Sequence, residues 1–527
     1  MKKLSYILLF ILFSNILYSC TDILETIPND RVSKEVFWRT EQDAILACNA
    51  IYCYLPNTTT WTNWDAMSDI GHVTKTTNWQ SLVEKGAHDA LSSVVLNEWK
   101  ENYRGIQAAN IFLDNVDNVV TSNETLINRL KAEVRTLRAY FYISLAILWG
   151  DVPLLTHETT LEESREATRT PVEQIWTFIS EELTAAAAVL PITQAETGRA
   201  TKGAALAIKA RAMLYAKRYT EAATAAKEVM DLDVYDLYPS YKNLFTYEAE
   251  NNIEVIFDKQ YIKSSYRNNL FLIMCPNSVY PQSTANIVPT KMAIDIYQMT
   301  NGKEITDPES GFDPYNPYEN RDPRLKYNYI VIGSELPNGN IYDSRPGSGT
   351  ADAVGYAEIS TPTGFNVNKY LAKEDMADPS NGGLNTILLR YAEVLLTYAE
   401  AKIEANQIDE SVLDAINQIR QRPDVNMPPY TGITSQEDLR KIVRDERLME
   451  LPFEGLRYYD IRRWRIAEHT VPGPLMGMTY VDIADGTLKT VSISGFVRTF
   501  RTDRDYLWPI PQTELDVNDN LTQNPNW

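Results

Sequence analysis

Apolar residues recur at steps of three and four along much of the chain, which is the spacing of one face of an α-helix. The clearest run consists of Ile127, Leu130, Val134, Leu137, Phe141, Leu145 and Leu148. Gly150 and Pro153 follow it, and they predict that this helix ends at Gly150. Weaker forms of the same pattern predict helices over residues 35–54, 97–119, 171–190, 200–217, 220–231, 386–405, 411–422 and 435–451.

Between these helices the pattern weakens, above all from residue 232 to residue 385. Strands are predicted at residues 252–261 and 326–332. Loops rich in Thr, Asn, Pro, Gly and Asp are predicted at residues 57–90, 302–324 and 333–354. Thr170 is the expected N-cap, and Pro171 the first residue, of the helix that begins there.

One segment repeats after 189 positions. Leu206, Ala212, Leu214, Ala216, Glu221 and Ala226 match Leu395, Ala401, Ile403, Ala405, Glu410 and Ala415. Both copies read as two helices in close contact through alanines, which is typical of tetratricopeptide units, although a generic helical hairpin is the alternative. The predicted fold is mainly α, with a tetratricopeptide-like scaffold of helical hairpins and an irregular, loop-rich half.

The first twenty residues have the pattern of a secretory signal. A basic start at Met1-Lys2-Lys3 precedes an apolar run over residues 7–17, and Cys20 follows. A cysteine directly after the expected cut predicts a bacterial lipoprotein, with residues 1–19 removed and Cys20 carrying lipid; an ordinary signal with Cys20 unmodified is the alternative. Residues 20–527 are then a single domain, with helical units at about 35–231 and 385–465 and an irregular insertion at about 232–384.

Composition narrows the classes of partner. The formal net charge is −20 and the isoelectric point is near 4.8, which argues against nucleic-acid binding, since that needs clustered Lys and Arg. The same charge suits an outward-facing protein with a neutral ligand. Cys48, Cys53 and Cys275 are expected to be buried free thiols rather than a disulfide framework. The chain also contains 31 Tyr and 10 Trp, whose rings suit both a core and a wet binding surface.

Charged residues crowd the stretch from Arg440 to Arg465. Paired carboxylates there would suit acid–base catalysis, and Arg beside aromatic rings would suit nucleic acid. We favour a structural ion-pair lattice that nearly neutralises itself, because planar guanidinium groups match nearby carboxylates. Its expected members are Arg444, Glu446, Arg447, Glu450, Glu454, Arg457, Asp460 and Arg463.

No other catalytic arrangement stands out. The four His residues lack metal-binding spacing, and there is neither a nucleophile elbow nor a P-loop. We expect no catalytic residue, no cofactor and no metal. The Asp- and Asn-rich loops leave room for a structural calcium, although none has EF-hand spacing.

The residues best suited to bind a ligand lie in segment 58–80. A sugar presents a C–H face and a rim of hydroxyls, so its binder needs aromatic rings with polar side chains beside them. Candidate contacts are Trp61, Trp64, Asn78 and Trp79, with Asn63, Asp65 and Gln80 as polar neighbours, and Tyr280, Tyr315 and Tyr318 further along the chain. We expect replacement of Trp64 or Trp79 by Ala to weaken binding several-fold without unfolding the protein; the alternative is that some rings fill small cores or contact a partner.

Several segments, in order, carry a resemblance to one family. They are Cys20 with Leu24-Glu25 and Pro28, residues 137–142 and 150–154, residues 389–396 and 399–401, residues 445–447, 450–451, 453–455, 457 and 460–464, residues 508–511, and residues 523–525. With these the chain resembles, over nearly its whole length, the SusD/RagB family of outer-membrane nutrient-binding lipoproteins.

The resemblance implies a surface-exposed, lipid-anchored protein of the Bacteroidota outer membrane. It implies an oligosaccharide ligand, which is delivered to a TonB-dependent (SusC-like) outer-membrane transporter, and no chemistry. In the resembled family, a loop after the first helix supplies aromatic and Asn contacts, and segment 58–80 is in the corresponding place. Two alternatives remain: a peptide-binding uptake lipoprotein of the same architecture, and a lipid-anchored glycan hydrolase with two carboxylates across a cleft.

Overall fold

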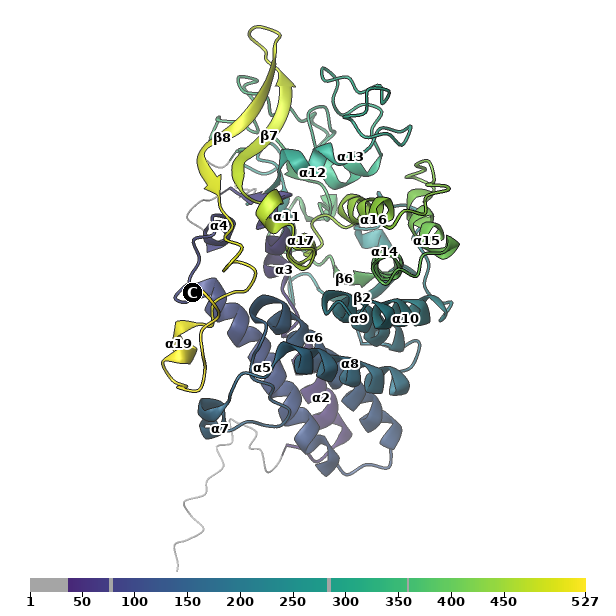
Figure 1. The fold of residues 1–527 in the computed structure, drawn as a ribbon, viewed down its shortest axis with the longest axis vertical. Helices are drawn as coiled ribbons and strands as arrows, with labels where there is room; N and C mark the ends of the chain where they lie inside the picture. Colours follow the sequence, from purple (N-terminus) through teal and green to yellow (C-terminus); the bar gives the residue numbers. More distant parts are fainter. Residues whose placement is uncertain (1–36, 75–78, 282–285, 358–359) are drawn as a thin grey trace, which may run out of the picture.

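The computed structural model describes residues 37–74, 79–281, 286–357 and 360–527, and most of its regular structure is helical (Figure 1). The predicted signal segment, Cys20 and Asn78 lie outside these ranges. The longer helices are α2 (Glu41–Tyr52), α3 (Thr58–Ala66), α5 (Ser93–Asn115), α6 (Glu124–Trp149), α8 (Val172–Val189), α9 (Lys202–Tyr215), α10 (Tyr219–Met230), α14 (Tyr391–Glu404), α15 (Glu410–Arg420) and α16 (Gln436–Glu450). The shorter ones are α4 (Trp79–Glu84), α7 (Leu161–Glu166), α11 (Leu270–Met274), α12 (Lys291–Asp295), α13 (Arg324–Asn328), α17 (Arg457–Arg463), α18 (Ala467–Thr470) and α19 (Gln512–Leu515), with 3₁₀ turns at Val116–Asn118, Tyr247–Ala249 and Lys373–Asp375.

The helices pack in an order that follows the chain. Helix α5 lies against α6, α6 against α8, α8 against α9, α9 against α10, α10 against α14, and α14 against both α15 and α16 (Figure 1). Helices α12 and α13 lie toward the end of the molecule that carries β7 and β8, whereas β2 pairs with β6 beside α9 (Figure 1). The prediction of a mainly α scaffold with an irregular half is therefore confirmed.

Helix α6, which carries the strongest apolar pattern in the sequence, forms as predicted, and its capping and packing explain why. Asn123 caps its first turn by accepting a hydrogen bond from Leu126 N–H. Its apolar face is buried, and Trp149 at its end donates to Pro509 O at 2.8 Å. Gly150 has φ of +72°, which favours glycine, and its N–H bonds to Ala146 O. The predicted end at Gly150 is confirmed.

The two repeated segments form helical hairpins, α9 with α10 and α14 with α15. Ala212, Ala226, Ala401 and Ala415 are buried at their contacts, where a small side chain lets two helices approach. The hairpins also meet each other through α10 and α14. Their likeness to tetratricopeptide units in particular remains a prediction.

All strands within the described ranges form two-stranded antiparallel pairs. The strands are β1 (Gly71–Val73), β2 (Val255–Lys259), β3 (Ile287–Pro289), β4 (Tyr329–Ile330), β5 (Asn366–Val367), β6 (Thr386–Arg390), β7 (Gly473–Val481) and β8 (Leu488–Arg498). The pairs are β1–β3, β2–β6, β4–β5 and β7–β8. The β7–β8 hairpin projects from the molecule and was not predicted (Figure 1), although Asp485-Gly486 at its turn is a hairpin signal.

Several predicted elements are wrong in type or in extent. Residues 386–390 are the strand β6 rather than the start of a helix, because this apolar segment pairs with β2, from Val255 opposite Arg390 to Lys259 opposite Thr386. The predicted loop at 57–90 contains α3, β1 and α4, and the strand predicted at 326–332 is preceded by α13 and begins only at Tyr329. Thr170 is not the N-cap of α8, because it pairs with Val152 in a β-bridge and Val172 N–H bonds to Asp151 instead.

The three described cysteines are free thiols, but their burial differs. Cys48 and Cys275 are buried as expected, whereas Cys53 is exposed. Cys53 follows the last turn of α2, so its side chain lies beyond the packed face of that helix. Among the described helices none is long and apolar enough to cross a membrane.

The charged stretch lies inside the C-terminal half. The fully buried carboxylate of Glu450 accepts hydrogen bonds from Arg390 at 2.7 Å and from Arg324 and Arg422 at 2.9 Å each. The other expected members pair as follows: Glu446 with Arg324 and Arg420, Glu454 with Arg390 and Lys369, Arg447 and Arg463 with Asp460, Arg457 with Asp69, and Arg444 with Glu404. Most partners lie outside the stretch, so its charges are not balanced within its own bounds. They join α16 and α17 to distant elements, in keeping with the expected lattice that ties the last long helix to its neighbours.

Candidate functional site

Three neighbouring cavities lie beside the segment that joins α2 to α3. The central cavity, of about 310 Å³, shares Asn57 and Glu98 with a cavity of about 550 Å³ that we call the amide cavity. It shares Cys53, Leu55, Lys259 and Tyr266 with a side cavity of about 270 Å³. The segment at residues 53–57 contributes lining residues to each of the three, so we treat them together as one candidate site.

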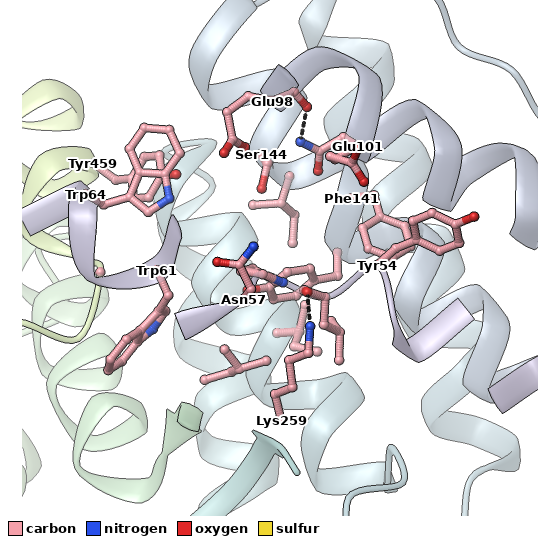
Figure 2. A pocket seen from close by; sticks show the side chains of 18 of the residues that line it. Tyr54, Asn57, Trp61, Trp64, Glu98, Glu101, Phe141, Ser144, Lys259 and Tyr459 are labelled. Carbon is pink, nitrogen blue, oxygen red and sulfur yellow. Dashed lines mark hydrogen bonds between the residues drawn. The ribbon is translucent and has the colours of Figure 1, made fainter. Parts of the chain in front are cut away.

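Aromatic rings dominate the central cavity. Trp61 and Trp64 of α3 lie on one side, and Phe141 and Ser144 of α6 lie across from them (Figure 2). Tyr54 and Tyr459 add further rings, Tyr459 from α17 near the end of the chain. The cavity is thus built by elements from both halves of the sequence.

The side chains of Trp61 and Trp64 form part of the wall of the central cavity and offer little exposed ring surface for a ligand to stack on. They are 4% and 5% exposed. Trp61 meets Tyr370 edge to face at 5.4 Å between ring centroids, and Trp64 lies 5.1 Å from Tyr459. The expectation that both rings stand on a loop, unused by packing, is wrong, because they lie three residues apart on one face of a helix that enters the core.

In contrast to Trp61 and Trp64, the predicted ligand-binding residue Trp79 keeps part of its ring accessible to a ligand. It is the first residue of α4, is only partly buried, and lines the amide cavity. Five asparagines, at positions 57, 63, 97, 268 and 269, line the same cavity together with Arg267. Of the expected polar neighbours, Asn63 is therefore beside Trp79, whereas Asp65 is buried and accepts the backbone N–H groups of Gly455 and Arg457.

The three predicted tyrosines lie elsewhere. Tyr315 is 56% exposed on a surface loop, and Tyr318 is buried with its ring 6.3 Å from that of Phe365. Tyr280 is partly buried after the turn at Pro276. None of the three lines the central, amide or side cavity, so the structure does not bring them to the tryptophans.

Charged residues that sequence reasoning missed face the cavities. Glu98 of α5 and Lys259 of β2 approach the central cavity from opposite sides (Figure 2). Burial, with the nearby Glu101 carboxylate, raises the pKa of Glu98 to about 7. Burial lowers the pKa of Lys259 to about 8, and its ammonium group donates to Leu55 O at 2.5 Å. No local pattern marks these residues, because their neighbours in space are remote in sequence.

The arrangement suits binding better than acid–base chemistry. Glu98 and Glu101 both project from α5, so a carboxylate pair across the central cavity would need Glu454. Both oxygens of Glu454 already accept hydrogen bonds from Arg390, and Lys369 adds a third. Within the described ranges, no three His, Cys, Asp or Glu side chains are grouped so that they would hold a metal ion. What the cavities offer is rings, amides and a few charges.

Comparisons with known proteins agree on one family. Residues 253–527 match the model of the SusD family, and residues 37–214 match a second model described as starch-binding and associating with the outer membrane. A crystal structure of a SusD-like carbohydrate-binding protein from Bacteroides fragilis has a TM-score of 0.84 at 31% identity and covers 92% of this chain and 100% of its own.

Two further relatives are similar over comparable lengths. A second SusD-like protein from Bacteroides fragilis has a TM-score of 0.82 at 29% identity, covering 95% of this chain and 100% of that one. SusD-like protein P25 from Formosa agariphila is 27% identical over 490 residues, which is 87% of this chain and 89% of its own. Since the first family match spans more than half of the sequence, the chain belongs to the SusD family.

Proposed function

We propose that this protein is a cell-surface lipoprotein that binds an oligosaccharide in the three neighbouring cavities and delivers it to a TonB-dependent outer-membrane transporter. It performs no chemistry on its ligand. The observation that carries the proposal is the amide cavity, in which a partly exposed tryptophan, Trp79, lies among asparagine side chains. A flat ring with amides beside it matches the C–H face and hydroxyl rim of a sugar.

Two findings about relatives support a glycan as the ligand. The Bacteroides fragilis protein with the TM-score of 0.84 is named a carbohydrate-binding protein. The family model that describes starch binding and outer-membrane association matches residues 37–214, the part of the chain that supplies Trp61, Trp64, Trp79 and Glu98.

The anchor and the transporter rest on the N-terminal sequence and on family membership. A cysteine directly after the signal segment would carry acyl chains, and more than one chain gives stable membrane attachment. Mass spectrometry of the purified membrane form should find a diacylglyceryl group on Cys20. Co-purification of a TonB-dependent transporter with the lipidated protein, lost for the form that starts at Thr21, would support delivery.

Calorimetry of the form that starts at Thr21, against plant, host and microbial glycans, tests the binding step. We expect affinity for one glycan class and no released product after overnight incubation. If no glycan gives a binding signal and peptides do bind, peptide uptake replaces the proposed function. Released product would make the protein a hydrolase and overturn it.

Replacing Trp79 with Ala should weaken glycan binding about fivefold. A stacked ring contributes on the order of 1 kcal/mol, and Trp79 is partly exposed, so the loss should appear in affinity with little change in melting temperature. Trp527→Ala is the matched control, because Trp527 is also partly buried but lines none of the three cavities. Equal affinities for wild type and Trp79→Ala would place the ligand elsewhere.

A further inference from the structure

The charges that face the cavities differ from those of the molecule as a whole. The chain has a formal net charge of −20. The charged residues that line the central, amide and side cavities are Glu98, Glu101, Glu196, Arg199, Arg211, Asp258, Lys259, Arg267 and Glu454. Which of these remain available to a ligand depends on their partners inside the protein.

Five of the nine are already paired. Arg211 binds Glu393, and Glu454 binds Arg390 and Lys369. Glu101 pairs with Arg104 at 2.6 Å, and Arg199 pairs with both Glu133 and Glu196. Together with Glu196 itself, these groups need no ligand to balance their charge, which leaves Glu98, Asp258, Lys259 and Arg267.

The two remaining cations lack a carboxylate. Within the described part of the chain, Lys259 donates only to the carbonyl oxygens of Cys53 and Leu55. Burial lowers its pKa to about 8, so it is still mostly charged at pH 7. Arg267 is exposed and forms neither an ion pair nor a hydrogen bond with any part of the chain that the structure describes. Both therefore present positive charge to the cavities.

The two remaining carboxyl groups lose charge readily. Burial raises the pKa of Glu98 to about 7 and that of Asp258 to about 6. Near pH 6 Glu98 is mostly protonated and Asp258 is about half protonated, whereas Lys259 and Arg267 remain charged. Taken together, the groups lining the three cavities then have a net positive charge inside a strongly acidic protein.

Asn63 gives an independent sign of a ligand at the same place. It is 2% exposed and lines the amide cavity, yet its side-chain nitrogen has no hydrogen-bond partner among the residues that the structure describes. An unmade hydrogen bond at a buried amide costs the full desolvation penalty of that group, so such a donor is normally satisfied. Asn63 and Arg267 are thus two hydrogen-bond donors that line one cavity and could bind an acceptor group of a ligand.

We propose that the site selects acidic glycans, whose carboxylate or sulfate groups accept hydrogen bonds from Arg267 and Asn63 in the amide cavity. The inference rests on the proposed glycan binding and names its ligand class. A guanidinium group holds a carboxylate through two parallel hydrogen bonds, and a tetrahedral sulfate presents two of its oxygen atoms for the same arrangement, as a phosphate does.

A glycan array that contains neutral, uronate-bearing and sulfated oligosaccharides, read with the form that starts at Thr21, tests the class. We expect the strongest signals from acidic members, and the uronate and sulfate arms tell the two anions apart. Carboxyl reduction or desulfation of the best ligand should then lower its affinity at least tenfold. Affinity should also fall as salt rises from 0.05 to about 0.5 M, because salt screens exposed charges.

Arg267→Gln should weaken binding of the best acidic ligand about tenfold and flatten its salt dependence, while Arg165→Gln should change neither. Arg165 is an exposed arginine of α7 that lines none of the three cavities, so it controls for the loss of one positive charge. Both arginines are exposed, so both variants should fold.

Affinity for the acidic ligand should rise between pH 8 and pH 6, as Glu98 takes up a proton and stops repelling the anion. Besides Glu98 itself, the groups that face it are Glu101 of α5, Tyr140 of α6, Tyr459 of α17 and Lys259 of β2. Lys259 gains charge in the same direction over this range, and Asp258 of the side cavity loses negative charge as well. Glu98→Gln should therefore make the rise smaller, and an unchanged rise would contradict a role for Glu98.

The outcomes separate the two proposals. If neutral glycans bind best and Arg267→Gln keeps full affinity, the inference about acidic ligands is wrong while glycan binding stands. If no glycan of any class binds, the proposed function fails together with it. If acidic peptides bind and acidic glycans do not, the charge argument is correct for the wrong class of ligand, and the proposal is overturned.

Discussion

Replacing Glu450 with Gln should lower the free energy of unfolding by about 3–5 kcal/mol. The Glu450 carboxylate lies between Arg324, Arg390 and Arg422, and its side chain is fully buried. Removing its charge would leave three guanidinium groups in the interior with one fewer counter-charge. Denaturant unfolding followed by circular dichroism would show the loss as a lower midpoint.

Glu404→Gln is the matched control. Glu404 pairs with Arg440 and Arg444, all of them partly exposed, so its replacement should cost less than about 1 kcal/mol. If Glu450→Gln kept its stability but lost ligand binding, the charged stretch would be part of the binding site rather than a structural lattice.

The contribution of the Glu450 carboxylate to stability should also appear in the dependence of stability on acidic pH. The three guanidinium groups hold the pKa of Glu450 well below its usual range in the folded protein. A carboxyl group with a depressed folded pKa stabilises the fold above its unfolded pKa, near 4.5, and this contribution is lost as pH falls toward the folded pKa. Wild-type stability should therefore fall more steeply below about pH 4.5 than that of Glu450→Gln.

Trp64→Ala should destabilise the protein by about 3–5 kcal/mol, which corrects the expectation of weaker binding without unfolding. Its ring centroid lies 5.3 Å from that of Tyr458, 5.1 Å from Tyr459 and 5.6 Å from Trp508, and the residue is 5% exposed. The truncated side chain would leave a cavity that these large rings cannot fill. Thermal and denaturant unfolding of the purified variant measure the effect.

Trp79→Ala serves as the comparison, because the two variants should differ in kind. Trp64→Ala is expected to unfold more easily, whereas Trp79→Ala is expected to bind less tightly at unchanged stability. A Trp64→Ala protein as stable as wild type, with its affinity lost, would mean that the exposed edge of Trp64 contacts the ligand and that its packing contributes little.

Secondary structure could be predicted where the apolar residues follow a clear helical period. The prediction failed where contacts with segments distant in sequence determine whether a helix or a strand forms. Helix α6 carries seven apolar residues on one face and was predicted to its C-cap. Helix α3 contains four Thr among nine residues, which disfavours a helix, and packing of Trp61 and Trp64 into the core overrides that preference. Strand β6 needs β2 as its partner, more than a hundred residues earlier, which no local window contains.

The candidate site could be predicted only in part, for the same reason. Aromatic and amide residues crowded between positions 58 and 80 indicated the right region, because Trp61 and Trp64 line the central cavity and Trp79 lines the amide cavity. Glu98, Lys259 and Arg267 come from elements with no unusual local composition. The tertiary fold brings these residues to the same cavities, so their proximity could not be predicted from their spacing in the sequence.

The segment at residues 53–57 closes all three cavities from the N-terminal side, while Tyr459 and its neighbours close the central one from the C-terminal side. Ribosomes make the N-terminal side first, so a growing chain has most of the lining residues long before it has the last wall. Fragments that stop before residue 455 would thus carry Trp79 and Arg267 without an enclosed central cavity. Such fragments are a poor source of binding activity in library screens, and display libraries built from this gene should keep the full C-terminal region.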